Sequence, residues 1–333
     1  MTDSPVYDTL IVGGGPAGLA AALHLAFHQR SVLVLDRGSG PLGYTTTPLW
    51  NVPGFVGVRG VALLKQLRAE AHTAGATLTK GNALRVSGEL GDFRIETETV
   101  TYRARTLLLA TGVARHHPRV GGHHAPWLAY AAKGNTYYCP DCEAPEIQGQ
   151  HVLVIGVDAP DSAAGVALTL SEFAQSVTVL LTGEAGLSES AADRLRERGI
   201  PVQMGEIAAL EGRRGHLDAL TLEDGSRLAP DAFFVVGPKL PRHELAMQLG
   251  LELSAKGHIQ TGWRGQTNVA GVWAAGDVQP QTQQVSVALG SGNMAAVMID
   301  QTLTRLGLRS PAAQLSAVTP PPSASPRLSS MSL

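Results

Sequence analysis

The stretch Tyr7-Asp8-Thr9-Leu10-Ile11-Val12, followed by Gly13-Gly14-Gly15-Pro16-Ala17-Gly18, decides the fold class of this chain. The apolar run predicts a buried strand, the glycines a tight turn, and the alanine- and leucine-rich residues 19–27 a helix. A second apolar run, 31–35, ends at Asp36. This order of strand, turn, helix and strand is typical of α/β proteins that bind dinucleotides.

The glycines and the acid have separate tasks in such a site. Gly13 allows the tight turn, Gly15 lets a pyrophosphate approach the backbone, and Gly18 lets the helix pack against the strand. The helix start at Pro16 and Ala17 offers unpaired N–H groups and a positive dipole end to phosphates. The Asp36 carboxylate follows about 20 residues on, where it can accept hydrogen bonds from ribose hydroxyls. A plain glycine-rich turn is the alternative, and the motif alone does not separate NAD from FAD.

The rest of the chain repeats this pattern in part. A helix is predicted over 60–74, and alternating runs at 83–87, 93–97 and 100–109 predict a small meander that returns to the main sheet. A second strand–turn–helix–strand unit is predicted over 151–156, 159–174 and 176–181. The final residues, from about 309, are rich in Pro, Ser and Ala and are predicted to be disordered.

Composition narrows the class of partner. The 333 residues include 44% hydrophobic and 16% charged side chains, with a net charge of -2, so nothing favours nucleic acid or an anionic membrane as a partner. No apolar stretch reaches the roughly 20 residues that span a bilayer. No signal peptide is visible at the start, and we therefore expect a cytoplasmic protein.

Two cysteines, Cys139 and Cys142 in Tyr-Tyr-Cys-Pro-Asp-Cys-Glu, are the only ones in the chain. Such a close pair favours a dithiol that cycles with its own disulfide, because structural disulfides usually close longer loops and structural zinc usually has four ligands. Zinc is the competing interpretation, since two pairs of histidines precede the cysteines: His116, His117, His123 and His124. A merely structural disulfide is the other.

Four ordered motifs resemble those of low-molecular-weight thioredoxin reductases. They are the glycine turn with Thr45-Thr46-Thr47 and Asn51-Val52-Pro53-Gly54, then Ala110-Thr111-Gly112, the cysteine pair, and Ala275-Gly276-Asp277-Val278. The resemblance implies an α/β fold of two Rossmann-like, three-layer (β/β/α) domains, the second inserted into the first. The FAD domain would comprise 1–113 and 245–310, the inserted domain 114–244, and the disordered tail 311–333. It also implies a homodimer.

The resemblance also implies roles for individual residues. Cys142 would face the flavin, Cys139 would attack the substrate disulfide, and Glu143 would replace the family's Asp as proton donor or acceptor. Asp277 would bind the ribityl or phosphate region of FAD, with Asn51 and Gln284 near the flavin. No metal ligand is expected. The full set of expected cofactor residues is Gly13, Gly15, Pro16, Ala17, Gly18, Asp36, Thr47, Asn51, Thr111, Gly112, Gly276, Asp277 and Gln284.

The second glycine turn departs from the family pattern. It reads Gly156-Val157-Asp158-Ala159-Pro160-Asp161, so acids stand where a pyrophosphate should approach. The next strand is followed by Thr182-Gly183-Glu184, without the basic cluster that binds the 2′-phosphate of NADPH in the family. Use of NADPH is therefore doubtful. NADH, with Glu184 on its ribose, is the alternative.

Together these patterns predict an FAD-dependent thiol-disulfide oxidoreductase with an electron donor other than NADPH. Electrons would pass through FAD and the Cys139–Cys142 pair to a thioredoxin-like protein or a small disulfide. Some relatives take electrons from ferredoxin or another reduced donor, and others run backwards as dithiol oxidases that use oxygen. A dithiol oxidase and a non-enzymatic flavin redox sensor are the alternative functions.

Overall fold

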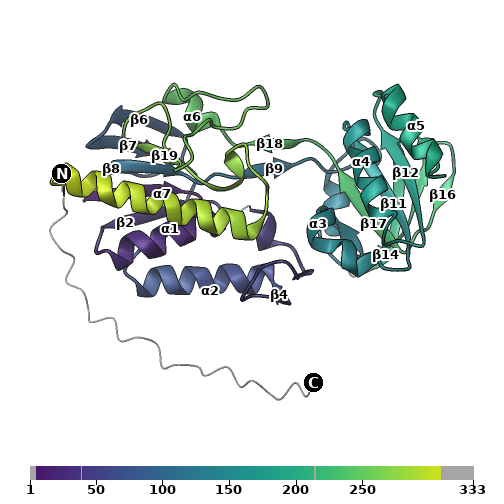
Figure 1. Cartoon of the computed structure of the whole chain (residues 1–333), viewed down its shortest axis with the longest axis horizontal. Helices are drawn as coiled ribbons and strands as arrows, with labels where there is room; N and C mark the ends of the chain where they lie inside the picture. Colours follow the sequence, from purple (N-terminus) through teal and green to yellow (C-terminus); the bar gives the residue numbers. More distant parts are fainter. Residues whose placement is uncertain (1–4, 39, 214, 309–333) are drawn as a thin grey trace, which may run out of the picture.

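The computed structural model describes residues 5–38, 40–213 and 215–308, so the predicted tail, 311–333, lies outside the described residues. Two lobes stand side by side, and each is built on a sheet with parallel strands covered by helices (Figure 1). The predicted α/β class with two Rossmann-like units is confirmed. No helix among the described residues is long and apolar enough to cross a membrane.

The first lobe contains a seven-stranded sheet. Its hydrogen-bonded order is β5-β2-β1-β8-β7-β6, and β19 also pairs with β8. The strands are β1 (Val6–Val12), β2 (Val32–Asp36), β5 (Thr77–Lys80), β6 (Arg85–Glu89), β7 (Asp92–Glu96), β8 (Thr101–Leu109) and β19 (Val272–Ala274). The predicted meander is confirmed: β6, β7 and β8 pair antiparallel, while β1, β2, β5, β8 and β19 run parallel.

Three helices cover one face of this sheet: α1 (Pro16–Phe27), α2 (Gly60–Thr73) and α7 (Val285–Arg305) (Figure 1). Their small and apolar side chains form one core with β1 and β2. Helix α7 lies so close to α1 that a Cβ added at Gly292 would come within 2.0 Å of the Ala17 carbonyl oxygen. The remaining short elements of this lobe are η1 (Pro41–Gly43), β3 (Pro48–Leu49), β4 (Val58–Arg59), α6 (Glu244–Gln248) and η4 (Gly276–Val278).

The second lobe has a five-stranded parallel sheet in the order β10-β17-β11-β12-β13. The strands are β10 (Thr136–Tyr137), β11 (His151–Val157), β12 (Ser176–Thr182), β13 (Val202–Met204) and β17 (Ala232–Val236). Helices α4 (Pro160–Leu170) and α5 (Glu189–Glu197) pack with it, next to a three-stranded sheet of β14 (Ile207–Arg213), β15 (His216–Leu222) and β16 (Arg227–Leu228). The short segments η2 (Ala125–Ala129), α3 (Pro140–Glu143) and η3 (Ala144–Ile147) complete it.

Two strands connect the lobes. β9 (Val113–Arg115) and β18 (Lys239–Pro241) pair antiparallel at the narrow junction in Figure 1. The chain thus enters and leaves the second lobe side by side. The predicted domain limits, after residues 113 and 244, fall at or just beyond these strands.

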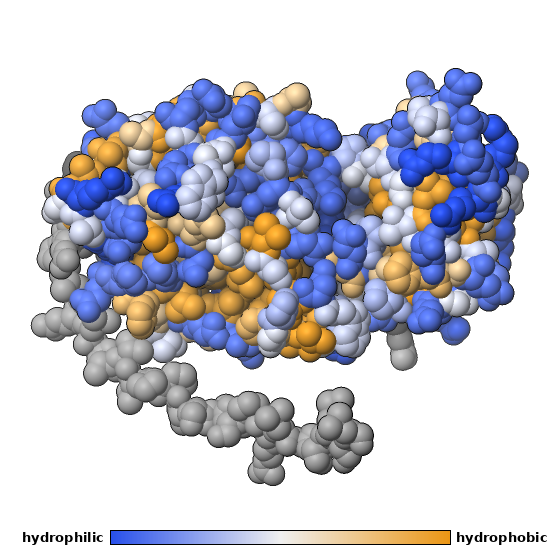
Figure 2. Space-filling model, viewed as in Figure 1, coloured by the Kyte–Doolittle hydropathy of each residue, from blue (hydrophilic) through white to orange (hydrophobic). Residues whose placement is uncertain are grey.

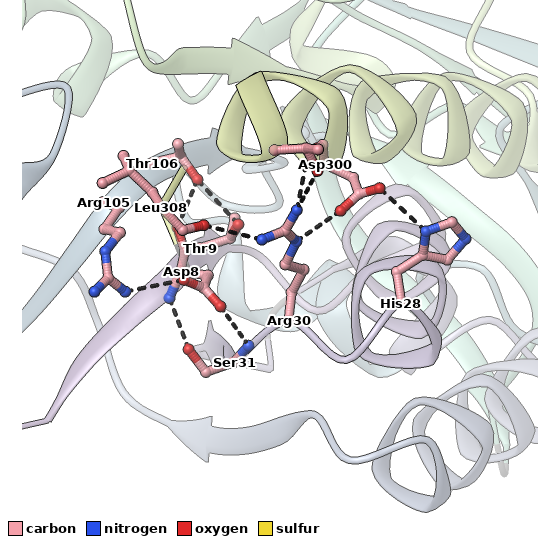
Figure 3. Close-up of polar contacts among 10 residues, drawn as sticks. Asp8, Thr9, His28, Arg30, Ser31, Arg105, Thr106, Asp300 and Leu308 are labelled. Atoms are coloured by element: carbon pink, nitrogen blue, oxygen red, sulfur yellow. Dashed lines mark hydrogen bonds and ion pairs between the residues drawn. The ribbon is translucent and has the colours of Figure 1, made fainter. Parts of the chain in front are cut away.

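A buried polar network stabilises the first lobe at the edge opposite the glycine turn (Figure 3). Asp8, fully buried, accepts hydrogen bonds from Arg105 and from the backbone N–H of Ser31. Beside it, Arg30 donates to the Asp300 side chain and to the Leu308 carbonyl oxygen, which ties the end of α7 to the chain after α1. The opposite edge, where the strands end, is left for the site.

Candidate active site

A cavity of about 760 Å³ runs from the first glycine turn to the cysteine pair. Its walls come from both lobes and include most of the predicted site residues. Those in the wall are Gly13, Gly15, Pro16, Ala17, Asp36, Thr47, Thr111, Gly112, Cys139, Cys142, Glu143, Gly276, Asp277 and Gln284. Gly18 and Asn51 are not part of the wall.

The glycine turn shows why it needs glycine. Gly13 has a φ of +112°, and a Cβ there would come within 2.2 Å of the Ala110 carbonyl oxygen. A Cβ at Gly18 would come within 1.9 Å of the Gly13 carbonyl oxygen. At Gly15, the N-cap of α1, nothing lies within 4 Å of an added Cβ, so this backbone is open to the cavity. The turn therefore offers an approachable backbone at a helix N-terminus, which suits a pyrophosphate.

Polar groups line the wall beyond the turn. Asp36 ends β2 and is bonded to the N–H of Gly38 and to the Arg68 side chain. Thr111 and Gly112 both hold the Arg242 backbone, at 2.7 and 3.0 Å. Arg242 also lines the cavity, and its buried Nε has no hydrogen-bond partner among the described residues. This unpaired donor beside an open backbone fits an anionic dinucleotide.

Among the cations that line the cavity, three lie near the connection between the lobes and were not predicted from the sequence. Arg115 lies on β9, Lys239 on β18, and Arg242 just after β18. Burial raises the pKa of Asp277, and the nearby charges of Lys239 and Arg115 partly oppose this shift. The sequence could have indicated these three residues, because all of them lie within a few residues of the predicted domain limits.

The two cysteines form a disulfide with a Cα–Cα distance of 5.3 Å. Cys139 is the N-cap of the short helix α3, and both sulfurs face the side chain of Gln284. The Gln284 Oε1 lies 3.5 Å from the Cys142 Sγ, and its Nε2 lies 3.9 Å from the Cys139 Sγ. The Asn51 Nδ2 donates to Gln284 Oε1 at 2.8 Å. Asn51 and Gln284, predicted to lie near the flavin, are thus brought to the disulfide.

With the disulfide formed, the Glu143 side chain points toward the backbone of the cysteine loop. Its Oε2 accepts hydrogen bonds from the N–H groups of Tyr138 and Cys139 at 2.8 and 2.9 Å, and its Oε1 accepts from the Thr47 hydroxyl at 3.0 Å. Burial raises its pKa, and these hydrogen bonds oppose the shift. The carboxyl group therefore holds the cysteine loop in place, and its role in proton transfer stays a prediction.

Further contacts hold the second lobe against the first near the disulfide. The Trp50 Nε1 donates to the Glu146 carboxylate, the Asn51 Nδ2 to the Asp141 carbonyl oxygen at 3.4 Å, and the Thr46 N–H to the Ala132 carbonyl oxygen at 3.1 Å. Together with Thr47–Glu143, these bonds keep the cysteine pair at the cavity. The segment of 46–51, between η1 and β4, supplies all four donors.

The second glycine turn has carboxylates where a nucleotide would bind. Asp158 adopts a φ of +50°, and its Oδ1 lies 2.7 Å from the Cβ that Gly183 lacks. The Asp161 Oδ1, in the first turn of α4, accepts from the Ser188 N–H at 2.9 Å. Glu206 accepts from the Gly183 N–H at 2.6 Å. Negative charge and side-chain bulk therefore gather at the edge where β11 and β12 end.

The histidines before the cysteine pair have other partners. The His117 Nδ1 lies 2.8 Å from the Tyr138 hydroxyl, which accepts from the buried Trp127 Nε1. The His124 Nδ1 lies 2.8 Å from the His117 carbonyl oxygen. Across the described residues, no group of three or more His, Cys, Asp or Glu side chains is arranged to hold a metal ion.

Comparison with known proteins assigns the chain to a family. The family model described as pyridine nucleotide-disulphide oxidoreductase matches residues 7–292. The chain belongs to this family. It is 31% identical to the thioredoxin reductase of Streptomyces clavuligerus, over 91% of this chain and 96% of that protein.

Solved structures of relatives agree. The crystal structure of HlmI matches with a TM-score of 0.82 and 28% identity, over 92% of this chain and 96% of that one. The atypical thioredoxin reductase TRi from Desulfovibrio vulgaris Hildenborough is 32% identical over 90% of this chain and 99% of its own, with a TM-score of 0.50. The protein is thus a low-molecular-weight, thioredoxin-reductase-like flavoprotein disulfide oxidoreductase, as the motifs predicted.

Proposed function

We propose that this oxidoreductase binds FAD in the cavity and reduces a partner disulfide with electrons from a donor other than NADPH. The partner is a thioredoxin-like protein or a small disulfide, as the names of its thioredoxin reductase relatives suggest. The main support for a donor other than NADPH is the position of Asp158, Asp161 and Glu206, whose carboxylates occupy the second nucleotide site.

The first site suits FAD. The open backbone at Gly15 and the start of α1 would hold the pyrophosphate, Asp36 the adenosine ribose, and Asp277 the ribityl chain. Gly13 and Gly18 allow the turn, while Pro16, Ala17, Thr111, Gly112 and Gly276 shape the wall. When bound, FAD supplies two-electron chemistry next to the Cys139–Cys142 disulfide. The chain's own part is to hold that disulfide at the cavity through Glu143, Thr47 and Gln284.

The second site opposes a nucleotide electrostatically. Each carboxylate about 4 Å from a phosphate would weaken binding by about 1–4 kcal/mol, depending on solvent exposure. The N–H of Gly183, which a ligand could use, already donates to Glu206. A one-electron donor such as a ferredoxin needs no nucleotide site on this lobe. The TRi relative, described as an atypical thioredoxin reductase, makes such a departure reasonable within the family.

Anaerobic stopped-flow flavin reduction tests the donor. We expect little bleaching of the flavin by micromolar NADPH or NADH, and rapid bleaching by a reduced ferredoxin or reduced methyl viologen. Fast bleaching by NADPH would refute the atypical donor. If the reduced enzyme instead transferred its electrons to oxygen faster than to a disulfide, the dithiol oxidase would replace the reductase.

A cysteine variant tests the relay. Cys142→Ser should leave flavin reduction intact and lower reduction of a disulfide substrate at least a hundredfold, because the second sulfur is needed to resolve the mixed disulfide. Surviving turnover would exclude the dithiol mechanism.

The homodimer and the cytoplasmic location stay predictions. Sedimentation equilibrium of the purified chain checks the homodimer.

A further inference from the structure

Gln284 treats the two sulfurs of the disulfide differently. It is the N-cap residue of the 21-residue helix α7, and its side chain reaches across to the cysteine loop. Its carbonyl oxygen faces Cys142, and its amide nitrogen faces Cys139. An amide has one acceptor end and one donor end, so its orientation decides which cysteine meets which chemistry.

Asn51 fixes that orientation. Its Nδ2 donates to the backbone carbonyl oxygen of Asp141, which can only accept, and this determines which way the Asn51 amide points. The same Nδ2 donates to Gln284 at 2.8 Å, so Gln284 must present its oxygen there. The Gln284 nitrogen is then left to face Cys139. A chain of three hydrogen-bonding groups thus transmits the polarity of one peptide carbonyl to the sulfurs.

We propose that Gln284, oriented by Asn51, keeps Cys139 as the thiolate and Cys142 as the thiol once the disulfide is reduced. The inference rests on the proposed thiol-disulfide exchange. The N–H of Gln284 donates to the Cys139 thiolate, and the Cys142 S–H donates to the Gln284 carbonyl oxygen. Gln284 acts on the reacting atoms directly, and Asn51 is a positioning residue.

Other charged groups surround the pair. Arg115 and Lys239 from the connecting strands, Asp277 from η4, and Asp141 and Glu143 from α3 face the same end of the cavity, with the Tyr138 hydroxyl buried beyond. The start of α3, where Cys139 is the N-cap, also favours a thiolate on Cys139. The Gln284 amide adds a preference whose direction Asn51 sets.

The exchange balances with these assignments. The Cys139 thiolate attacks one sulfur of the partner disulfide, forming a mixed disulfide and releasing a partner thiolate. The Cys142 thiol gives its proton to that thiolate and then attacks the Cys139 sulfur. The Cys139–Cys142 bond re-forms, the second partner thiolate leaves and takes a proton from solvent, and two electrons have passed to the partner.

The test is the pH profile of alkylation at each cysteine, measured by mass spectrometry. The full-length holoprotein is reduced anaerobically with a phosphine and pulsed with iodoacetamide between pH 5 and 9. In the wild type, Cys139 should react at least about tenfold faster than Cys142 at pH 7, because a hydrogen bond to a charged group alone is worth about that factor. Gln284→Leu should lower the preference by about that factor, and Gln283→Leu, the same change at the neighbouring residue, should keep it.

Asn51→Asp tests the orientation of the Gln284 amide directly. A carboxylate at position 51 accepts rather than donates, so the Gln284 amide should turn over and the preference should shift toward Cys142. This variant also serves if Gln284→Leu fails to fold. Equal alkylation of both cysteines in the wild type, or an unchanged ratio in Asn51→Asp, would overturn the inference. Neither result bears on the donor, which flavin bleaching tests separately.

Discussion

At the scale of single residues, Arg30 shows how a buried charge is satisfied in this fold. Its side chain is 4% exposed, and its guanidinium group donates to the Asp300 side chain and to the Asp300 and Leu308 carbonyl oxygens (Figure 3). It also donates to the Thr304 hydroxyl. All these acceptors lie on α7 or just after it. One side chain therefore attaches the last described helix to the end of α1.

Arg30→Ala should lower the free energy of unfolding by about 2–4 kcal/mol, since it removes four hydrogen bonds and leaves Asp300 with His28 as its remaining partner. Arg85→Ala is the matched control. That arginine also pairs with a carboxylate, Glu96, but is 76% exposed, and its loss should cost less than about 1 kcal/mol. Urea denaturation measures both, and equal losses would contradict the burial argument.

His117 makes stability depend on pH. Burial, with Arg115 nearby, lowers the pKa of His117 from 6.5 to about 4. Between these values the unfolded chain binds a proton that the folded chain does not, so stability falls as the pH drops from 6.5 toward 4. Partial exposure limits this loss to about 1–3 kcal/mol.

Asn at position 117 keeps an acceptor for the Tyr138 hydroxyl but does not titrate. We therefore expect His117→Asn to lose less stability than the wild type between pH 7 and pH 4.5, by urea denaturation at each pH. Parallel losses in the two proteins would show that His117 does not carry the effect.

At the scale of elements, the contact between α1 and α7 builds the floor of the cavity. Gly292 is buried against the Ala17 carbonyl oxygen, and Gly276 would bring a Cβ within 2.9 Å of the Ala17 Cβ. Small residues let α7 approach the glycine turn, which in turn places Gln284, at its start, over the cysteine pair. The sequence showed the small residues of this helix but not the element that they touch.

Gly292→Ala should push α7 away from α1 and lower stability by about 1–3 kcal/mol, with weaker flavin retention. Gly290→Ala, two residues earlier in the same helix, meets nothing within 4 Å and should raise stability by about 0.5–1 kcal/mol. Thermal unfolding and the flavin-to-protein absorbance ratio measure both effects. A destabilised Gly290→Ala would mean that the helix, not the contact, is sensitive.

At the scale of the whole molecule, the two lobes meet through a narrow connection and a set of polar contacts. Figure 2 shows the narrow waist, the part of the molecule where the two lobes meet. It also shows apolar side chains along the lower part of the first lobe, in the region of α1 and α2. Near the waist, Trp50 remains 42% exposed although its indole N–H bonds Glu146. Hydrogen bonds from residues 46–51 therefore help to hold the lobes together, beside Tyr44, which packs against the core of the second lobe.

Trp50→Phe removes the indole donor to Glu146 and keeps most of the ring. We expect faster amide hydrogen exchange in 139–147, by about two- to tenfold, because opening at the junction becomes easier. Trp263→Phe, on an exposed tryptophan of the first lobe, should leave exchange in this segment unchanged. If Trp50→Phe exchanged like the wild type, this contact would not restrain the cysteine loop.

The sequence by itself determined the α/β class, both strand–turn–helix units, the meander and the family. These follow from local patterns, because a glycine turn between an apolar strand and a helix leaves few alternatives. The absence of a basic cluster after the second strand and the acids of the second turn are also visible in short stretches of the sequence. Asp158, Asp161 and Glu184 could be read directly, and only Glu206, from the segment after β13, was added by the fold.

Only the tertiary structure decided which distant groups meet. Thr47 bonds Glu143, Asn51 bonds Gln284, and Arg115 and Lys239 reach the cavity through the pairing of β9 with β18. Such pairs depend on how the lobes pack and on which end of a side-chain amide points where. No periodicity encodes that choice, because it is set by hydrogen bonds between residues far apart in the chain.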